Sequence, residues 1–85
     1  MEQEAKQLYT AISTVINKVK SNKGITYTDL CAGNDIPQST YDDIMNAKTK
    51  ASFYNIAKVL RALDLNFEEF GRLLDEELPD DFLYC

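Results

Sequence analysis

The most informative part of the chain is residues 26–50, TYTDLCAGNDIPQSTYDDIMNAKTK, which predicts two short helices joined by a tight turn. The first helix is expected over about residues 27–33. A run of glycine, asparagine, aspartate and proline over residues 33–37 then breaks it, because these residues favour turns or cannot continue a helix. The second helix is expected over about residues 38–46. The stretch therefore predicts a compact two-helix unit with a polar connector after it.

The apolar residues of this stretch are spaced so that one side of each helix faces inward. These inward residues are Leu30, Cys31, Ile36, Tyr41 and Ile44. The polar side chains of the second helix are then left at or near the surface. When the second helix of such a unit is exposed and its N-terminal end points outward, it can enter the major groove of B-DNA.

The preceding segment predicts a long amphipathic helix. Its apolar residues recur at helical spacing: Leu8, Ile12, Val15, Ile16 and Val19. Gly24 follows the segment and can take the left-handed conformation that ends a helix. Thr26, with Asp29 three residues later, then has the spacing of a capping box and predicts the start of the next helix.

Two more helices are predicted after residue 50. Ser52 can cap the first, whose inner stripe is predicted to be Phe53, Ile56, Val59, Leu60 and Leu63. Asn66 can cap the second, whose stripe is Phe67, Phe70, Leu73, Leu74 and Leu78. Pro79 ends the pattern. Since no segment alternates like a half-buried strand, the fold class expected is all-α with five helices.

Length and composition predict one domain of ordinary globular character. The chain has 85 residues, 45% hydrophobic, and is expected to hold one core over about residues 5–78, with an acidic and aromatic tail over 79–85. The formal charge is −5, and the acidity lies at the C-terminal end, where residues 67–85 hold seven carboxylates and one arginine. No apolar run is long enough for a membrane span or a secretory signal, so a cytoplasmic protein is expected.

The residue types argue against catalysis and against a bound metal or cofactor. The chain has no histidine, no glycine-rich phosphate loop, and no nucleophile with a base nearby. Its two cysteines, Cys31 and Cys85, fit no metal or redox spacing. Cys31 is predicted to be a small buried hydrophobe and Cys85 a free thiol in the tail. We therefore expect no enzyme, no cofactor and no metal site.

The order and spacing of these motifs over about residues 8–78 resemble the lambda-repressor-like, Cro-type helix-turn-helix family of phage and bacterial regulators. The resemblance is carried by ITYTDLCA at 25–32, IPQSTYDDI at 36–44 and VLRALDLNFEEF at 59–70. In addition, IMNAK at 44–48 is similar to the family's Ile-x-Asn-Gly-Lys. The resemblance implies a lambda-repressor-like helix-turn-helix at about 26–46 and a transcriptional regulator, a repressor by the family's example. Such a protein would bind a palindromic DNA operator as a homodimer in the cytoplasm of a bacterial or phage-infected cell.

The resemblance also implies roles for individual residues. Base-reading positions are Gln38, Ser39, Thr40 and Asp43, and phosphate-contacting positions are Tyr27, Asn46, Lys48 and Lys50. The apolar stripe of residues 67–78 either covers its own core or pairs in part with a second copy. The residues expected at such a dimer interface are Phe70, Leu74 and Leu78.

One departure from the family pattern keeps a second hypothesis open. Asp42 and Asp43 lie on the second helix of the unit, with no arginine or lysine from residue 38 to residue 47. Acidic side chains facing phosphates are repelled, although carboxylates near a helix N-terminus also stabilise the helix. The alternative is a protein-interaction module, resembling an anti-repressor or a DNA mimic, that uses the acidic face and the tail over 75–85.

The arrangement of charge is expected to discriminate between the two hypotheses. A cluster of lysines beside Gln38 would favour DNA, and a face dominated by carboxylates would favour a protein partner. The lysines in question are Lys18, Lys20, Lys48 and Lys50.

Overall fold

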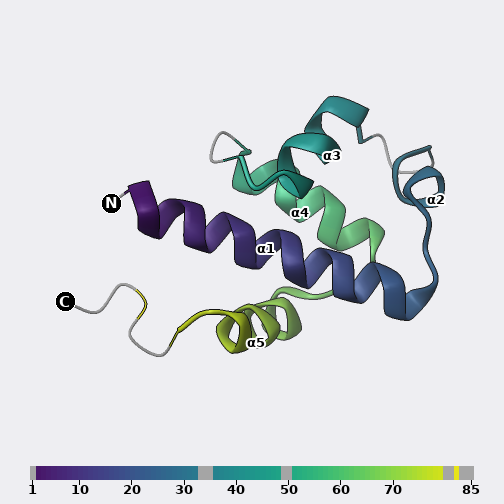
Figure 1. Ribbon diagram of the computed structural model, residues 1–85. Coiled ribbons are helices and arrows are strands. Elements are labelled where there is room, and N and C mark those ends of the chain that lie inside the picture. Colours follow the sequence, from purple (N-terminus) through teal and green to yellow (C-terminus); the bar gives the residue numbers. More distant parts are fainter. Residues whose placement is uncertain (1, 33–35, 49–50, 80–81, 83–85) are drawn as a thin grey trace.

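The computed structural model describes residues 2–32, 36–48, 51–79 and 82, which form five helices (Figure 1). These helices are α1 (Glu2–Lys23), α2 (Tyr27–Ala32), α3 (Gln38–Met45), α4 (Phe53–Ala62) and α5 (Phe67–Glu77). No strand occurs among the described residues. The prediction of an all-α chain with five helices is confirmed.

The helices begin where the capping residues predict. The Thr26 N–H donates to Asp29 Oδ2 at 3.3 Å, and the Asp29 N–H donates back to Thr26 Oγ1 at 3.2 Å, so the capping box of α2 is formed. The same contact, from a backbone N–H to the cap oxygen three residues earlier, joins Asn55 to Ser52 at 3.2 Å and Glu69 to Asn66 at 2.8 Å. These are the predicted caps of α4 and α5.

All five helices contribute to one hydrophobic core. Helix α1 crosses the middle of the molecule, with α3 and α4 on one side and α5 on the other (Figure 1). The side chains with 0% exposure come from α1 and from α4 and the turn that follows it: Ile16, Val59, Leu60 and Leu63. Every residue of the α2–α3 stretch predicted to face inward is buried: Leu30, Cys31, Ile36, Tyr41 and Ile44.

Two aromatic residues of the predicted apolar stripes lie outside the core. The assignment of Phe53 to an inner stripe is wrong, whereas Phe67 belongs to the stripe of residues 67–78, for which contact with a second copy was also considered. Phe53 is 63% exposed and Phe67 is 51% exposed. Each is the first residue of its helix, and helical side chains lean toward the N-terminus, so both rings project past the end of the packed turns. There they stack on each other, with ring centroids 5.8 Å apart and planes at 28°.

The structure also changes the expectation for a dimer interface on α5. Phe70 is 5% exposed and belongs to the core of its own chain, because it is the α5 residue that turns directly toward that core. It therefore has almost no surface to offer a second copy. Leu74 and Leu78 are half-buried and keep part of their surface.

Three helices end on a residue with a left-handed backbone: Gly24 (φ 66°), Ala47 (φ 57°) and Asp64 (φ 56°). Each is followed by an N–H that reaches back five residues, as in a Schellman motif. The three bonds join Ile25 to Lys20 (3.0 Å), Lys48 to Asp43 (2.9 Å) and Leu65 to Leu60 (2.9 Å). Only Gly24 was predicted: aspartate tolerates this conformation, so the residue type at 64 is compatible with it, whereas alanine at 47 gives no indication of it.

Replacing Ala47 by glycine is expected to stabilise the protein. A Cβ in the left-handed region costs about 1–2 kcal/mol, and glycine loses about 0.5–1 kcal/mol more backbone entropy on folding, so the net gain should be about 0.5–1 kcal/mol. Chemical denaturation of both proteins measures it. The control is Ala5→Gly inside α1, where the backbone is helical and glycine should destabilise. An Ala47→Gly variant no more stable than the wild type would contradict the left-handed conformation at this position.

Candidate nucleic-acid interface

Helix α3 is the element that carries the predicted base-reading residues, and its inner side is firmly anchored. Tyr41 and Ile44 are buried in the core. At the C-terminal end of α3, the Ser13 hydroxyl of α1 donates to the Met45 carbonyl at 2.9 Å. Ser13 is itself 8% exposed, the one buried polar side chain among the described residues. The sequence reasoning missed this anchor, although a serine between Ile12 and Val15 on an apolar face was the available signal.

Tyr41 joins α3 to both α1 and α2. Its ring lies 4.8 Å from the ring of Tyr27, with the planes at 44°. The Lys20 ammonium of α1 donates to the Tyr41 hydroxyl at 2.5 Å and lies 5.2 Å from the ring centroid. The prediction that Tyr41 belongs to the core is confirmed, and Lys20 extends the contact to the surface.

Tyr27, the predicted phosphate contact on α2, is half-buried against Tyr41. Burial raises the pKa of its hydroxyl above the ordinary value, and the neighbouring Cys31 and Asp42 raise it further. The hydroxyl is therefore protonated at neutral pH, and its interaction with the Cys31 thiol is among the causes of its raised pKa. Burial likewise raises the pKa of the Cys31 thiol, which suits the predicted role of Cys31 as a small buried hydrophobe.

The N-terminal end of α3 presents polar groups outward. Gln38 and Ser39 are exposed, and Thr40 is half-buried. Pro37 occupies the cap position with an extended backbone (φ −62°, ψ 145°) and provides no capping side chain. Because the first N–H groups of a helix need acceptors from outside, this end combines unsatisfied donors with a partial positive charge. Such an end can bind an anionic group or a base edge.

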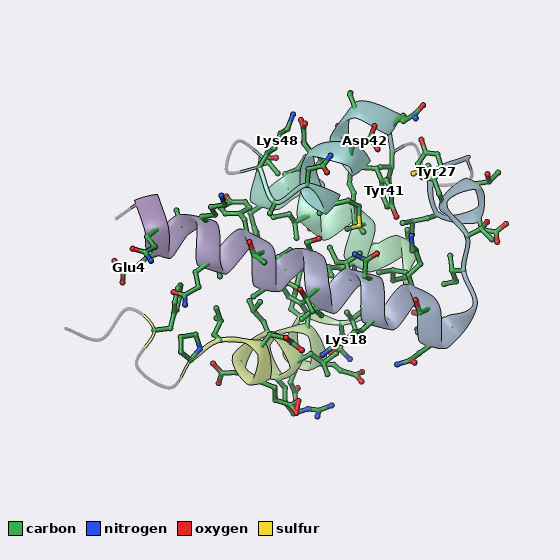
Figure 2. The ribbon with its side chains drawn as sticks, in the orientation of Figure 1. Glu4, Lys18, Tyr27, Tyr41, Asp42 and Lys48 are labelled. Carbon is green, nitrogen blue, oxygen red and sulfur yellow. The ribbon has the colours of Figure 1, made fainter. Side chains whose placement is uncertain are left out.

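Two predicted site residues pair with each other. Asp43 Oδ1 lies 3.6 Å from Lys48 Nζ, which joins a predicted base contact to a predicted phosphate contact. The pair offsets one of the two carboxylates on α3. Asp42 is exposed and forms no ion pair with any described residue, so its negative charge faces solvent (Figure 2).

The cluster of lysines beside Gln38 that would have favoured DNA does not form among the described residues. Lys18 lies away from α3 and pairs with Glu77, which ties α1 to α5 (Figure 2). Lys20 is engaged with Tyr41, and Lys48 with Asp43. Lys50 lies outside the described residues. Two of the four lysines thus remain near α3, and Asn46, exposed at its C-terminal end, adds a neutral donor.

The described residues hold no group of three or more metal-ligating side chains. Nor is any helix in the described part of the chain both long enough and apolar enough to cross a membrane.

The chain matches no protein-family model, and no curated protein or solved structure shows significant similarity to it. The resemblance to lambda-repressor-like regulators therefore stays a prediction, and the functional argument depends on the geometry of α2 and α3.

Proposed function

We propose that this protein is a sequence-specific DNA-binding regulator, with α2 and α3 as a helix-turn-helix at about residues 26–46. The observation that carries the proposal is the N-terminal end of α3, where exposed Gln38 and Ser39 project from a helix anchored on its other side. A reading helix has to be held rigidly while its polar end stays accessible to base edges.

Each residue at this end has a role that suits its chemistry. Gln38 can form a bidentate pair with adenine in the major groove, and Ser39 can bond several bases. Thr40 is half-buried, so less of its side chain is accessible to a base edge than at Gln38 and Ser39. Asn46 and Lys48 follow α3 and would contact phosphates in this proposal, as would Lys50 by its position in the sequence. Tyr27 supplies a further hydroxyl donor from α2.

Asp43 takes part in this reading through Lys48. While the two are paired, the carboxylate repels phosphates less than a lone aspartate would. Where a cytosine faces α3, Asp43 can instead accept a hydrogen bond from its N4 amino group, and Lys48 is then released toward the backbone. Recognition of a cytosine by Asp43 would thus be coupled to a phosphate contact by Lys48.

The wider assignment follows from the resemblance in the sequence. A repressor of the lambda-repressor-like family would bind a palindromic operator as a homodimer, with half-sites about 34 Å apart. It would work in the cytoplasm of a bacterial or phage-infected cell.

A second candidate function is a protein-interaction module on the same scaffold. It is favoured by the exposed carboxylate of Asp42, which pairs with no described residue, and by the exposed Asp75 and Glu76 on α5. In that role the α3 face would bind a basic protein and no DNA, with the acidic tail over 75–85 contributing. Fold alone does not decide between the two functions.

Selection of bound duplexes from a random-sequence library at low salt tests the proposal. Recovery of a palindromic motif, with affinity falling steeply as salt is raised, is the expected result. A selection without enrichment at any salt concentration would reject DNA reading and favour the interaction module. Capture of protein partners, with and without residues 79–85, would then be compared.

Changing Asp42 to asparagine is expected to strengthen DNA binding. The substitution removes an unpaired negative charge from the helix that faces phosphates, so affinity should rise about 3- to 10-fold at low salt and less at high salt. Fluorescence anisotropy with the selected duplex measures the change. The matched control, Asp75→Asn on α5, alters the net charge equally but lies away from α3, and should change affinity much less. Weaker DNA binding by Asp42→Asn would indicate that Asp42 accepts a hydrogen bond from a base.

A further inference from the structure

The large hydrophobic side chains that are exposed among the described residues are all aromatic: Phe53, Tyr54 and Phe67, here called the aromatic patch. Tyr54 is 70% exposed, and Phe53 and Phe67 form the stacked pair at the start of α4 and α5. Soluble monomers expose single apolar side chains routinely, but a contiguous aromatic group is typical of an interaction surface. None of these three residues takes part in the candidate interface on α2 and α3.

The patch continues along the outer face of α4 as a shallow groove of about 270 Å³. The residues that line the groove are Tyr54, Ala57, Lys58, Arg61 and Ala62. Ala57 and Ala62 leave room between the longer side chains, so an aromatic ring from a partner could lie against the helix. The Lys58 ammonium lies 5.3 Å from the Tyr54 ring centroid, at the edge of the groove.

Charges of both signs border the patch. Lys58 and Arg61 come from α4, and Glu68 and Glu69 come from the first turn of α5, next to Phe67. Glu69 is paired with Arg72 at 3.6 Å. Arg61 and Glu68 are exposed and form no ion pair with a described residue. A surface that carries its own complementary charges matches a second copy of itself, because a two-fold axis brings residue i of one copy to residue j of the other and the reverse.

We propose that the aromatic patch and the α4 groove form the surface through which two copies of this chain associate as a two-fold dimer. Each Tyr54 ring lies in the groove of the partner copy, and Arg61 of each copy faces Glu68 of the other. This inference deepens the proposed function, since it assigns the dimer surface of the DNA-binding protein to α4 and the start of α5. It places the interface away from buried Phe70. Because α4 contacts α3 directly, a dimer built on α4 also sets the position of one reading helix relative to the other.

Sedimentation equilibrium of the full chain, without DNA and with a reductant that keeps Cys85 reduced, tests the surface. Wild-type protein is expected to form dimers within a range of about 1–500 µM. Tyr54→Ser should raise the dimer dissociation constant about 10-fold or more, because it removes a central aromatic anchor. Tyr54 is so exposed that the fold should survive, which circular dichroism and a thermal melt would verify. The control is Leu78→Ala, which removes a half-buried residue of the alternative α5 surface and should leave association unchanged.

A charge exchange provides the second, independent test. Arg61→Glu alone and Glu68→Arg alone should each weaken association about 3- to 10-fold, and the double variant should recover most of the loss. Wild-type protein that stays monomeric over the whole range would overturn the proposal. Dissociation by Leu78→Ala but not by Tyr54→Ser would overturn it as well. This measurement does not depend on DNA binding. If the variants lose association as predicted but the wild-type protein selects no duplex, the dimer surface is supported and the proposed function is rejected.

Discussion

Replacing Tyr41 by alanine should lower the free energy of unfolding by about 3–5 kcal/mol, the range found for removing a large buried aromatic side chain. Tyr41 is 6% exposed, packs against the Tyr27 ring in a tilted pair and accepts a hydrogen bond from Lys20. Its loss leaves a cavity where α1, α2 and α3 meet. Because a domain of this size is stabilised by only about 5–15 kcal/mol, the variant should unfold at a much lower denaturant concentration.

Tyr41→Phe is the matched control for this prediction. It keeps the ring, its tilted contact with Tyr27 and its contact with the Lys20 ammonium, and it removes only the hydroxyl. The expected loss is about 0.5–1.5 kcal/mol, the net contribution of one hydrogen bond. Urea denaturation followed by circular dichroism measures both variants. If Tyr41→Ala cost no more than Tyr41→Phe, the ring would not be part of the core, and the anchoring of α3 would have to be explained differently.

Sequence patterns predicted those parts of the fold that depend on local interactions. The caps at Thr26, Ser52 and Asn66 form as predicted, because each involves a side chain and an N–H only three residues away. The inner residues of the α2–α3 stretch were also predicted correctly, since helical spacing alone places them on one side.

The assignment that was wrong depends on where one helix meets another. Phe53 has the right spacing for the inner stripe, but it is the first residue of its helix and is exposed, as is Phe67 at the start of α5. Their stacking joins residues 14 positions apart in the sequence, and periodicity carries no information about such a contact. Ala47 illustrates a second limit, because its backbone is left-handed although alanine rarely adopts that conformation and gives no indication of it.

The candidate site was predicted in its composition and only partly in its arrangement. Gln38 and Ser39 are exposed as expected, because they stand at the start of a helix whose next inward residue is Tyr41. The pairing of Asp43 with Lys48 and the removal of Lys18 to the α5 side follow from how the helices are placed in space. The net charge of each segment therefore indicated how many positive and negative side chains the α3 region carries, but not which of them would form ion pairs.

Replacing Gln38 by alanine is expected to cost about 1–3 kcal/mol of binding free energy toward the selected duplex, a loss of roughly 5- to 150-fold in affinity. The side chain is exposed at the first position of α3, so its removal leaves the core intact. Because Gln38 is proposed to pair with one base, selectivity at that base position should relax, while binding to unrelated duplexes should hardly change. Anisotropy titrations against the selected duplex and four single-position variants of it would measure both effects.

The control is Gln3→Ala, which removes the same side chain from an exposed position on α1 and should not affect DNA binding. Lys50→Ala, at a predicted phosphate contact, should behave differently from both: it should weaken all duplexes alike and reduce the salt slope by about one. The effects of these three substitutions distinguish a base-specific contact from a non-specific attraction to phosphates. If Gln38→Ala lowered affinity for every duplex equally, Gln38 would be a backbone contact, and another residue of α3 would have to read the base. If it changed nothing while thermal stability was retained, α3 would not be the reading helix, and the acidic interaction module would be the better account of its exposed face.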